Sequence, residues 1–249
     1  MFQNIGEILL LLWRTFCALP QSFRQRKMIF EQLFEIGNRS LLMACLLSIF
    51  IGGVVALQSG PMLAERGIAS ALGGLVGISL AKELSPVMMA ILIAGRIGSA
   101  MAAEIGSMRV YQEVDALRTM NINPIHYLVL PRITAICIAM PLLVIFSMLV
   151  GWMGGGFVAV ANHRIALTFQ TFFSNLHDVV QLKDVANGLI KSLAFAFVIG
   201  TVSCHQGLTT IGGPRGIGRS VTKAVVNSIV LILILDYYIT RLMLAFDND

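Results

Sequence analysis

The chain has 249 residues, of which 57% are hydrophobic and only 12% are charged, and its formal net charge is +5. A soluble domain usually carries about twice that charged fraction, so this composition excludes a single water-soluble core and predicts that lipid surrounds most of the chain. The basic residues do not form a run interleaved with aromatic residues, which argues against a nucleic-acid partner.

The first 38 residues are expected to form an N-terminal interfacial helix. Residues 8–13 are apolar but too few for a span, and no small-residue cleavage site follows them, so we expect no cleavable signal peptide. Arg14, Arg24, Arg26 and Lys27 come next. Basic residues beside a short apolar stretch are typical of a helix that lies on the membrane face.

Five later stretches are apolar enough to cross a bilayer, which takes about 20 residues. They are residues 40–57, 84–103, 133–161, 189–204 and 224–246. The third contains Pro141 and the run Gly154–Gly156, which predicts a kink or an early end. The fourth is short, and we expect it to begin near Val185. The prediction is an all-α polytopic membrane protein with one domain, residues 1–249, whose transmembrane core is 39–246.

Residues 67–81 are mildly apolar and glycine-rich, so they could form a sixth span or part of a long second one. With five crossings and the N-terminus inside, eleven of the eighteen Lys and Arg residues lie on the cytoplasmic side and four lie outside. Six crossings would move Arg109, Arg118 and Arg132 outside. The positive-inside rule therefore favours five spans, with a cytoplasmic N-terminus and a periplasmic C-terminus.

Several charged residues lie in or beside these spans, where each costs roughly 2.5–3.5 kcal/mol at the bilayer centre. They are Lys82, Glu83, Arg96, Lys191 and Asp236. They can form structural ion pairs, or they can form a polar patch in a substrate path. Both interpretations stay open for Lys82 and Glu83, whereas a structural role is favoured for Arg96 and Asp236.

A charged segment, residues 104–120, separates two apolar stretches. Helical spacing places Val110, Val114 and Leu117 on one stripe, away from the charged residues. A short amphipathic helix joined to two spans cannot cross the bilayer. We therefore expect this connector to lie at the surface and to bind a soluble partner.

The segment 162–187 is expected outside the membrane, where Phe169, Phe172 and Phe173 could belong to an interfacial helix or to a loop anchored among the headgroups. The loop is the favoured interpretation. Small residues at four-residue spacing, such as Gly73 with Gly77 and Gly151 with Gly155, predict close helix packing within a subunit or across a dimer.

The segment 213–220 matches a phosphate-binding loop except that Arg219 replaces the lysine. No strand precedes it, so a cytoplasmic turn is predicted, and any ATP must bind another chain. The four cysteines form no CxxC and the four histidines have no ligand spacing, which argues against a metal site. No hydrolase motif is present, so we expect neither catalysis nor a cofactor bound by this chain.

The run from Lys82 to Met120 resembles the MlaE (YrbE) family of lipid ABC-transporter permeases. ELxP, AGRxGxA, AEIGxMR and the pair Pro131-Arg132 occur in order, and the similarity extends over about residues 32–246. Asp236 falls within it. The order and number of these motifs make the resemblance specific.

The resemblance implies the membrane subunit of a complex that moves phospholipids between the inner and outer membranes and maintains outer-membrane lipid asymmetry. Two copies would form the core in the inner membrane, and a cytosolic ATPase using ATP and Mg would dock on each copy. A ring of MCE-domain proteins would lie on the periplasmic side, and some systems add a small STAS-domain protein. The ATPase-coupling helix would include Arg109, Glu113, Asp115, Leu117 and Arg118.

By the same resemblance, the lipid cavity opens outward at the dimer centre. Its expected lining is Val55, Gln58, Met62, Leu63 and Arg66, with Lys82 and Glu83 deeper. Structural intramembrane charges would be Arg96, Glu104 and Asp236. The alternatives are a passive scaffold and a secondary transporter or channel that uses intramembrane charges as a relay, although five spans supply no inverted repeat pairs.

Overall fold

The computed structural model describes residues 26–163, 165 and 167–247. These residues are overwhelmingly helical and include no strand, which confirms the all-α prediction. The expected interfacial helix falls largely on residues 1–25, outside the described residues. Residues 26–38 form the first turns of α2 (Arg26–Glu65).

Five helical stretches among the described residues are long and apolar enough to cross a membrane, as predicted. They are Arg26–Glu65, Ala69–Val110, Ile125–Ala161, Leu182–Leu208 and Gly213–Ala245. Residues 67–81 are not a sixth span. Gly67, with φ +73, lies in a turn after α2, and the second stretch begins two residues later.

The second span is one helical run that changes its winding twice. It comprises η2 (Ala69–Ala71), α3 (Leu72–Ser79), η3 (Leu80–Leu84), α4 (Ser85–Ile93), η4 (Ala94–Gly98) and α5 (Ser99–Val110). η3 and η4 are π-helical turns, which are rare and often found at functional sites. They contain three of the charged residues singled out in the sequence, Lys82, Glu83 and Arg96.

The third span is η5 (Ile125–Val129) followed by α7 (Leu130–Ala161). The predicted early end is wrong, whereas the alternative, a kink, stays a prediction. α7 continues through Pro141 and through three consecutive glycines. Proline is tolerated within transmembrane helices. Gly154 and Gly155 lie close to the backbone of α2, which leaves little room for a side chain there. α9 (Leu182–Leu208) starts three residues before the expected Val185, and α10 (Gly213–Asp247) completes the chain.

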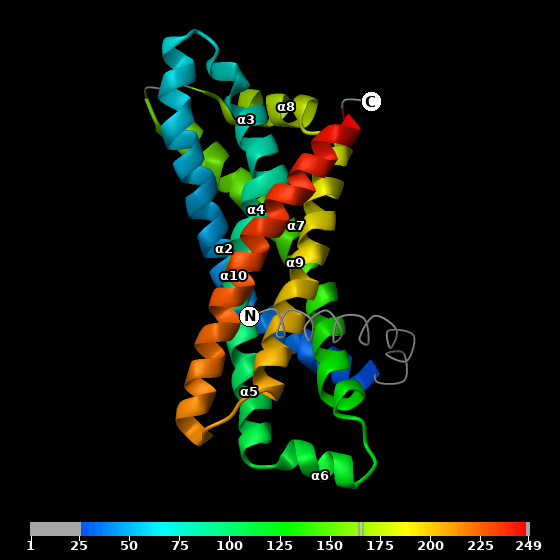
Figure 1. Cartoon of the computed structure of the whole chain (residues 1–249). Coiled ribbons are helices and arrows are strands. Elements are labelled where there is room, and N and C mark those ends of the chain that lie inside the picture. The colour runs from blue at the N-terminus through cyan, green and yellow to red at the C-terminus, as the bar shows by residue number, and fades with distance from the viewer. Residues whose placement is uncertain (1–25, 164, 166, 248–249) are drawn as a thin grey trace. The chain divides into compact units, whose positions relative to one another are not determined.

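Residue contacts group the chain into two compact units, and the boundaries between them fall within α2, α4, α7 and α9. The expectation of a single domain stays a prediction. Unit 1 is residues 1–40, 90–140 and 193–249, and unit 2 is residues 41–89 and 141–192. In unit 1, α10 packs along α5 (Figure 1). A small core of Ile105, Val129, Ile133 and Cys204 holds α5, α7 and α9 together.

In unit 2, α8 (Phe169–Val179) lies against α3 (Figure 1). The favoured prediction of an aromatic loop here is wrong, because Phe172 is fully buried in the unit 2 core. A Cβ at Gly73 would lie 2.0 Å from the carbonyl oxygen of Phe172, so glycine allows the two backbones to touch. The Asn175 carboxamide accepts a hydrogen bond from the Gly74 amide at 2.7 Å and fixes this contact.

Candidate functional site

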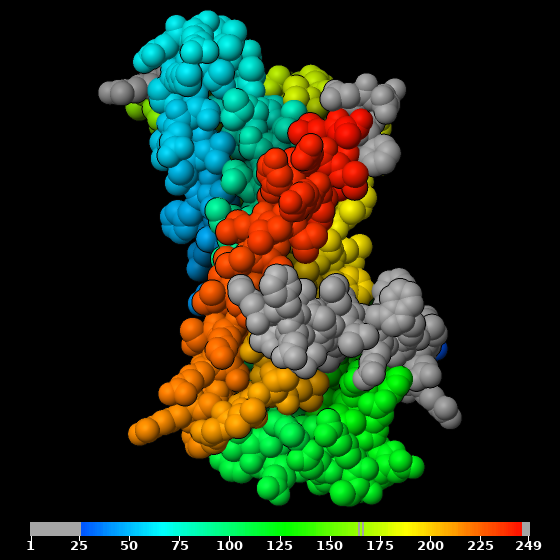
Figure 2. Space-filling view, viewed as in Figure 1, coloured from blue at the N-terminus to red at the C-terminus, as the bar shows by residue number. Residues whose placement is uncertain are grey.

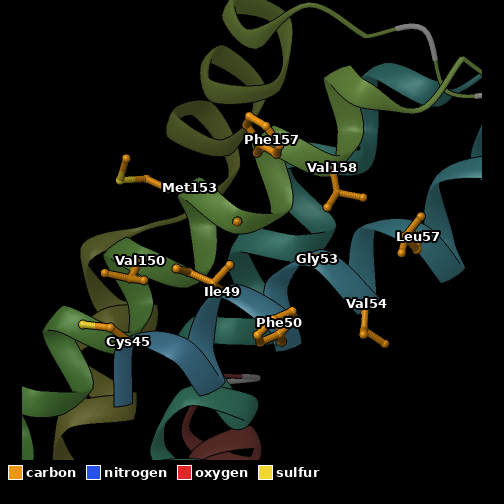
Figure 3. A pocket seen from close by; sticks show the side chains of 11 residues that line it. Cys45, Ile49, Phe50, Gly53, Val54, Leu57, Val150, Met153, Phe157 and Val158 are labelled. Carbon is orange, nitrogen blue, oxygen red and sulfur yellow. The ribbon is translucent and has the colours of Figure 1, made fainter. Parts of the chain in front are cut away.

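An apolar groove of about 680 Å³ runs between α2 and α7 in unit 2 (Figure 3). All eleven lining residues lack a charged or amide side chain. They are Cys45, Ile49, Phe50, Gly53, Val54, Leu57, Val150, Met153, Gly154, Phe157 and Val158. The volume lies within the range of about 300–1,000 Å³ that is typical of ligand sites.

Glycines bring α2 and α7 together along the groove. A Cβ at Gly52 would lie 2.0 Å from the Gly151 carbonyl oxygen, and one at Gly154 would lie 2.5 Å from the Ile49 carbonyl oxygen. Deeper in the unit, the Ser48 and Ser147 hydroxyls are hydrogen-bonded at 2.7 Å. The helices therefore meet backbone to backbone, and the larger side chains beside the contact line form the walls.

The residues predicted to line the lipid cavity do not line this groove. Val55 and Leu63 are half-buried and pack against the core cluster of unit 2. Gln58, Met62 and Arg66 are exposed.

These exposed residues nevertheless continue a row that starts in the groove. Residues four apart share a helix face, and Phe50 and Val54 precede Gln58 and Met62 at that spacing. The exposed face thus gains the polar side chain of Gln58 toward the end of α2, and Arg66 follows after the apolar Met62. The sequence analysis missed Phe50, Val54 and Leu57, although bulky residues beside glycines were a readable signal.

Lys82 and Glu83 both form ion pairs with α9, within unit 2. The Lys82 Nζ lies 2.9 Å from Asp184 Oδ1, and the Lys191 Nζ lies 2.7 Å from Glu83 Oε2. Lys191 is only 2% exposed. The π-helical turn η3 presents the two consecutive charges, and α9 supplies their partners two helical turns apart. The structure therefore shows the ion-pair arrangement for Lys82 and Glu83, and Asp184 is a partner that the sequence analysis missed.

The other intramembrane charges are arranged less uniformly. Glu104 of α5 pairs with Arg132 of α7 at 3.0 Å, and Arg132 also donates to the Leu128 carbonyl. Arg96 lies half-buried in η4, and no ion pair of the described residues includes it. Asp236 lies half-buried in α10. The structural role expected for Arg96 and Asp236 stays a prediction.

The connector between the second and third spans is a broken helix in unit 1, not the single helix expected over 104–120. α5 ends at Val110, Gln112 adopts a left-handed φ of 63°, and α6 (Glu113–Thr119) follows. Asp115 accepts hydrogen bonds from Arg109 at 2.5 Å and from Arg118 at 3.4 Å. These charge contacts tie α6 back to the end of α5.

The predicted apolar stripe of the connector is only partly buried. Val114 is 1% exposed, and Leu117 and Val110 are half-buried. Glu113 is exposed. The connector thus rests on Val114 and leaves its acidic first turn accessible.

Large apolar side chains flank α6 at the surface, and the sequence analysis missed them. Tyr111 is 67% exposed and Met120 is 61% exposed, and both lie outside the apolar windows of the spans. Tyrosine and methionine are enriched in protein–protein interfaces. Together with Glu113 they form what we term the connector face: Tyr111, Glu113 and Met120.

Comparison with known proteins agrees with this architecture. The family model described as Permease MlaE matches residues 29–242. The chain belongs to the MlaE permease family. A probable ABC transporter permease protein of Rickettsia typhi is 36% identical over 241 residues, covering 97% of this chain and 92% of the relative.

Two further relatives of this chain come from other lineages. A probable ABC transporter permease protein of Synechocystis is 36% identical over 248 residues, covering 100% of this chain and 94% of the relative. The Arabidopsis thaliana protein named TRIGALACTOSYLDIACYLGLYCEROL 1, chloroplastic, is 36% identical over 210 residues, covering 84% of this chain and 59% of the relative.

These relatives show that the chain is a multi-pass membrane subunit of an ABC transporter, a class whose ATPase activity lies in a separate subunit. The phosphate-loop-like segment 213–220 does not form the predicted turn. It makes up the first two turns of α10, because only Gly212 and Gly213 adopt positive φ and the helix starts at once.

Proposed function

We propose that this permease moves phospholipids between the inner and outer membranes of a bacterial envelope, as the membrane core of an ATP-driven transporter. The observation that carries the proposal is the apolar groove between α2 and α7, whose exposed row on α2 continues to Gln58 and Arg66. A phospholipid has the same order of parts, an apolar chain and then a charged head. The name of the Arabidopsis relative contains that of a glycolipid, which supports a lipid substrate.

In this proposal the groove provides a path for the lipid and does not attract its acyl chains. Lipid tails are as apolar as leucine, so an acyl chain gains no hydrophobic free energy when it leaves the bilayer for the groove. The head group is the costly part, and the guanidinium of Arg66 and the amide of Gln58 can donate hydrogen bonds to a phosphate. Net movement therefore needs work from outside this chain, which ATP hydrolysis would supply.

The partners that we propose follow from the same function. A cytoplasmic ATPase with ATP and Mg would bind the connector face, and α6 would pass its movement to the spans that it joins. A second copy of the permease would complete the membrane core, and an MCE-domain ring and a small STAS-domain protein would complete the complex. The N-terminus would be cytoplasmic and the C-terminus periplasmic.

Filling the groove tests the lipid proposal. In Val54→Trp the indole occupies the space between α2 and α7, and overpacking of this kind costs about 1–3 kcal/mol. We expect roughly a tenfold loss of lipid-stimulated ATP turnover by the purified complex in nanodiscs, with the protein still folded. Leu149→Trp is the matched control, because Leu149 is equally exposed, at 48%, and lies on α7 outside the groove.

Equal activity of the two tryptophan variants would count against a lipid path through the groove. Transport that runs on an ion gradient in the absence of the ATPase would instead favour a secondary transporter. The pairing of Lys82 and Glu83 with opposite charges favours a structural role over a relay. A passive scaffold would show no lipid-dependent ATP turnover in any variant.

Truncating the connector face tests the docking role. Tyr111→Ala removes an exposed aromatic side chain, and anchors of this type contribute about 2 kcal/mol or more to binding. We expect a roughly thirtyfold rise in the Kd for the ATPase subunit, measured by titration in detergent. Thr119→Ala is the control, because Thr119 is exposed on α6 and its hydroxyl bonds only within the helix, to Ala116.

A charge variant examines the same role independently. Replacing both Glu113 and Asp115 with lysine reverses the acidic first turn of α6 and removes the carboxylate that holds Arg109. If the ATPase still co-purifies with this double variant and lipid-coupled ATP turnover is unchanged, the connector is not its docking site.

A further inference from the structure

A row of basic residues occupies the start of α10, in unit 1. Arg215, Arg219 and Lys223 are exposed and follow one another at four-residue spacing, so they share one face of the helix. None of the ion pairs of the described residues includes them. The sequence contains no Asp or Glu from residue 185 to residue 235. Like charges four residues apart repel each other, so this row favours a bound anion.

The row lines two adjoining grooves. One has a volume of about 560 Å³ and is lined by all three basic residues with Gly218 and Thr222. The other has a volume of about 330 Å³, shares Arg219 and Lys223 with the first, and extends to the end of α9. Arg219 and Lys223 therefore border a recess at the end of α9, whereas Arg215 lies on the more open surface of α10.

Two buried polar side chains open into the second groove without a partner. Gln206 is 7% exposed and Ser220 is 9% exposed, and both line this groove. Neither side chain forms a hydrogen bond with another described residue. The hydrogen bonds that Gln206 accepts from the Thr209 and Thr210 hydroxyls go to its main-chain carbonyl. Both groups can donate to an anionic oxygen.

The backbone adds to this preference for an anion. α10 is 35 residues long and has no acidic residue in its first turn, so the positive end of its dipole is not neutralised locally. The cations and the two polar donors meet at Arg219, Ser220 and Lys223, one to two helical turns after this terminus. Together they describe a site for a phosphate group.

We propose that this site binds the phosphate head group of an anionic membrane lipid. The basic row is continued on the same face of α10 by exposed apolar residues, Val226, Val230 and Leu233, which are 52%, 49% and 53% exposed. Figure 2 shows this helix, in orange to red, at the surface of the molecule. A head group at Arg219 would place its acyl chains along that apolar stripe.

The amphiphilic order of the face favours a lipid over free phosphate or an acidic protein. Lys223 is followed at once by the apolar span, and Ile211, which is 87% exposed, borders the same groove. A lipid can cover these apolar neighbours with its acyl chains while its phosphate meets the basic row. Basic clusters next to a transmembrane helix are a recurrent means of binding anionic lipids. The site shares no residue with the α2–α7 groove, so its lipid is bound rather than transported.

The experiment uses the full-length permease in phosphatidylcholine nanodiscs that contain a trace of spin-labelled phosphatidylglycerol or spin-labelled phosphatidylcholine. The immobilised fraction of each label, measured by electron paramagnetic resonance, gives the preference for the anionic lipid. We expect wild type to prefer phosphatidylglycerol and Arg219→Gln to reduce that preference about fivefold. Arg241→Gln, which removes one charge near the other end of α10, is the control and should change it little.

Gln206→Leu distinguishes a built site from a general field of positive charge, because it leaves the net charge unchanged. We expect it also to lower the preference. Unchanged preference in both Arg219→Gln and Gln206→Leu, or an equal loss in Arg241→Gln, would overturn the proposal. If Arg219→Gln does not fold, Arg215→Gln tests the same row from a fully exposed position.

The other possible ligands give different results. If millimolar inorganic phosphate displaces the labelled phosphatidylglycerol from wild type, the site takes free phosphate and the lipid assignment is wrong. If Arg219→Gln weakens ATPase binding and leaves the lipid preference intact, the row is a protein contact. Loss of lipid preference with ATPase binding intact supports the proposal, and this readout does not depend on whether the permease transports phospholipid.

Discussion

Glu83→Gln is expected to lower the free energy of unfolding of the permease by about 2–3 kcal/mol. The substitution keeps the shape of the side chain but removes the negative charge 2.7 Å from Lys191, which is 2% exposed. Breaking a buried ion pair by removing one partner typically costs about 3–5 kcal/mol. We expect less because Glu83 itself is 40% exposed. The loss can be measured by unfolding in a denaturing-detergent titration.

Two further variants separate the effect of the buried charge from that of any lost carboxylate. In the double variant Glu83→Gln with Lys191→Met neither charge remains, and we expect most of the stability to return, since apolar replacements of buried pairs are often neutral or stabilising. Glu35→Gln breaks the pair with Arg39, whose side chains are 39% and 57% exposed, and should cost at most about 1 kcal/mol. Equal losses in Glu83→Gln and Glu35→Gln would contradict the argument.

Gly52→Ala is expected to separate α2 from α7 and to destabilise unit 2 by about 1–3 kcal/mol. The new methyl group would lie 2.0 Å from the carbonyl oxygen of Gly151, and a backbone atom cannot move aside as a side chain can. Since these helices form the two walls of the groove, lipid-stimulated ATP turnover should fall as well. Thermal unfolding in mild detergent and the turnover assay measure the two effects.

Gly37→Ala supplies the comparison on the same helix. No atom lies within 4 Å of a Cβ at Gly37, and alanine in the middle of a helix is more stable than glycine by roughly 0.5–1 kcal/mol. This variant should therefore unfold at the same temperature as wild type or at a higher one. If Gly52→Ala behaves in the same way, the close contact between α2 and α7 does not hold the groove together.

The transmembrane spans could be predicted from the sequence because length and apolar composition decide them. For α7 the same reasoning left open a kink, which stays a prediction, but it was wrong about an early end, since the local signals of Pro141 and Gly154 were outweighed by packing. It was also wrong about α8, because the burial of Phe172 depends on glycines of α3 about 100 residues earlier. Both errors arise from contacts between segments that no local pattern contains.

A candidate site residue could be predicted only where its own type was unusual for its place in the sequence. Lys82 and Glu83 stood out as charges in apolar surroundings, but the partner Asp184 did not, since it was placed in an outer loop. Its position depends on α9 starting at Leu182 and on the π-helical turn that faces it. The groove was not predicted because the resemblance implies a cavity lined by the end of α2, whereas the groove is lined by the middle of that helix.

The two ion pairs of unit 2 also bear on how the permease responds to voltage. Moving one elementary charge through a potential of 100 mV involves about 2.3 kcal/mol of electrical work. Lys82, Asp184, Glu83 and Lys191 carry two positive and two negative charges. If these four side chains shift together along the membrane normal, the work done by the potential is close to zero. The polarisation of the cell membrane therefore neither drives nor opposes a rigid displacement of these two ion pairs.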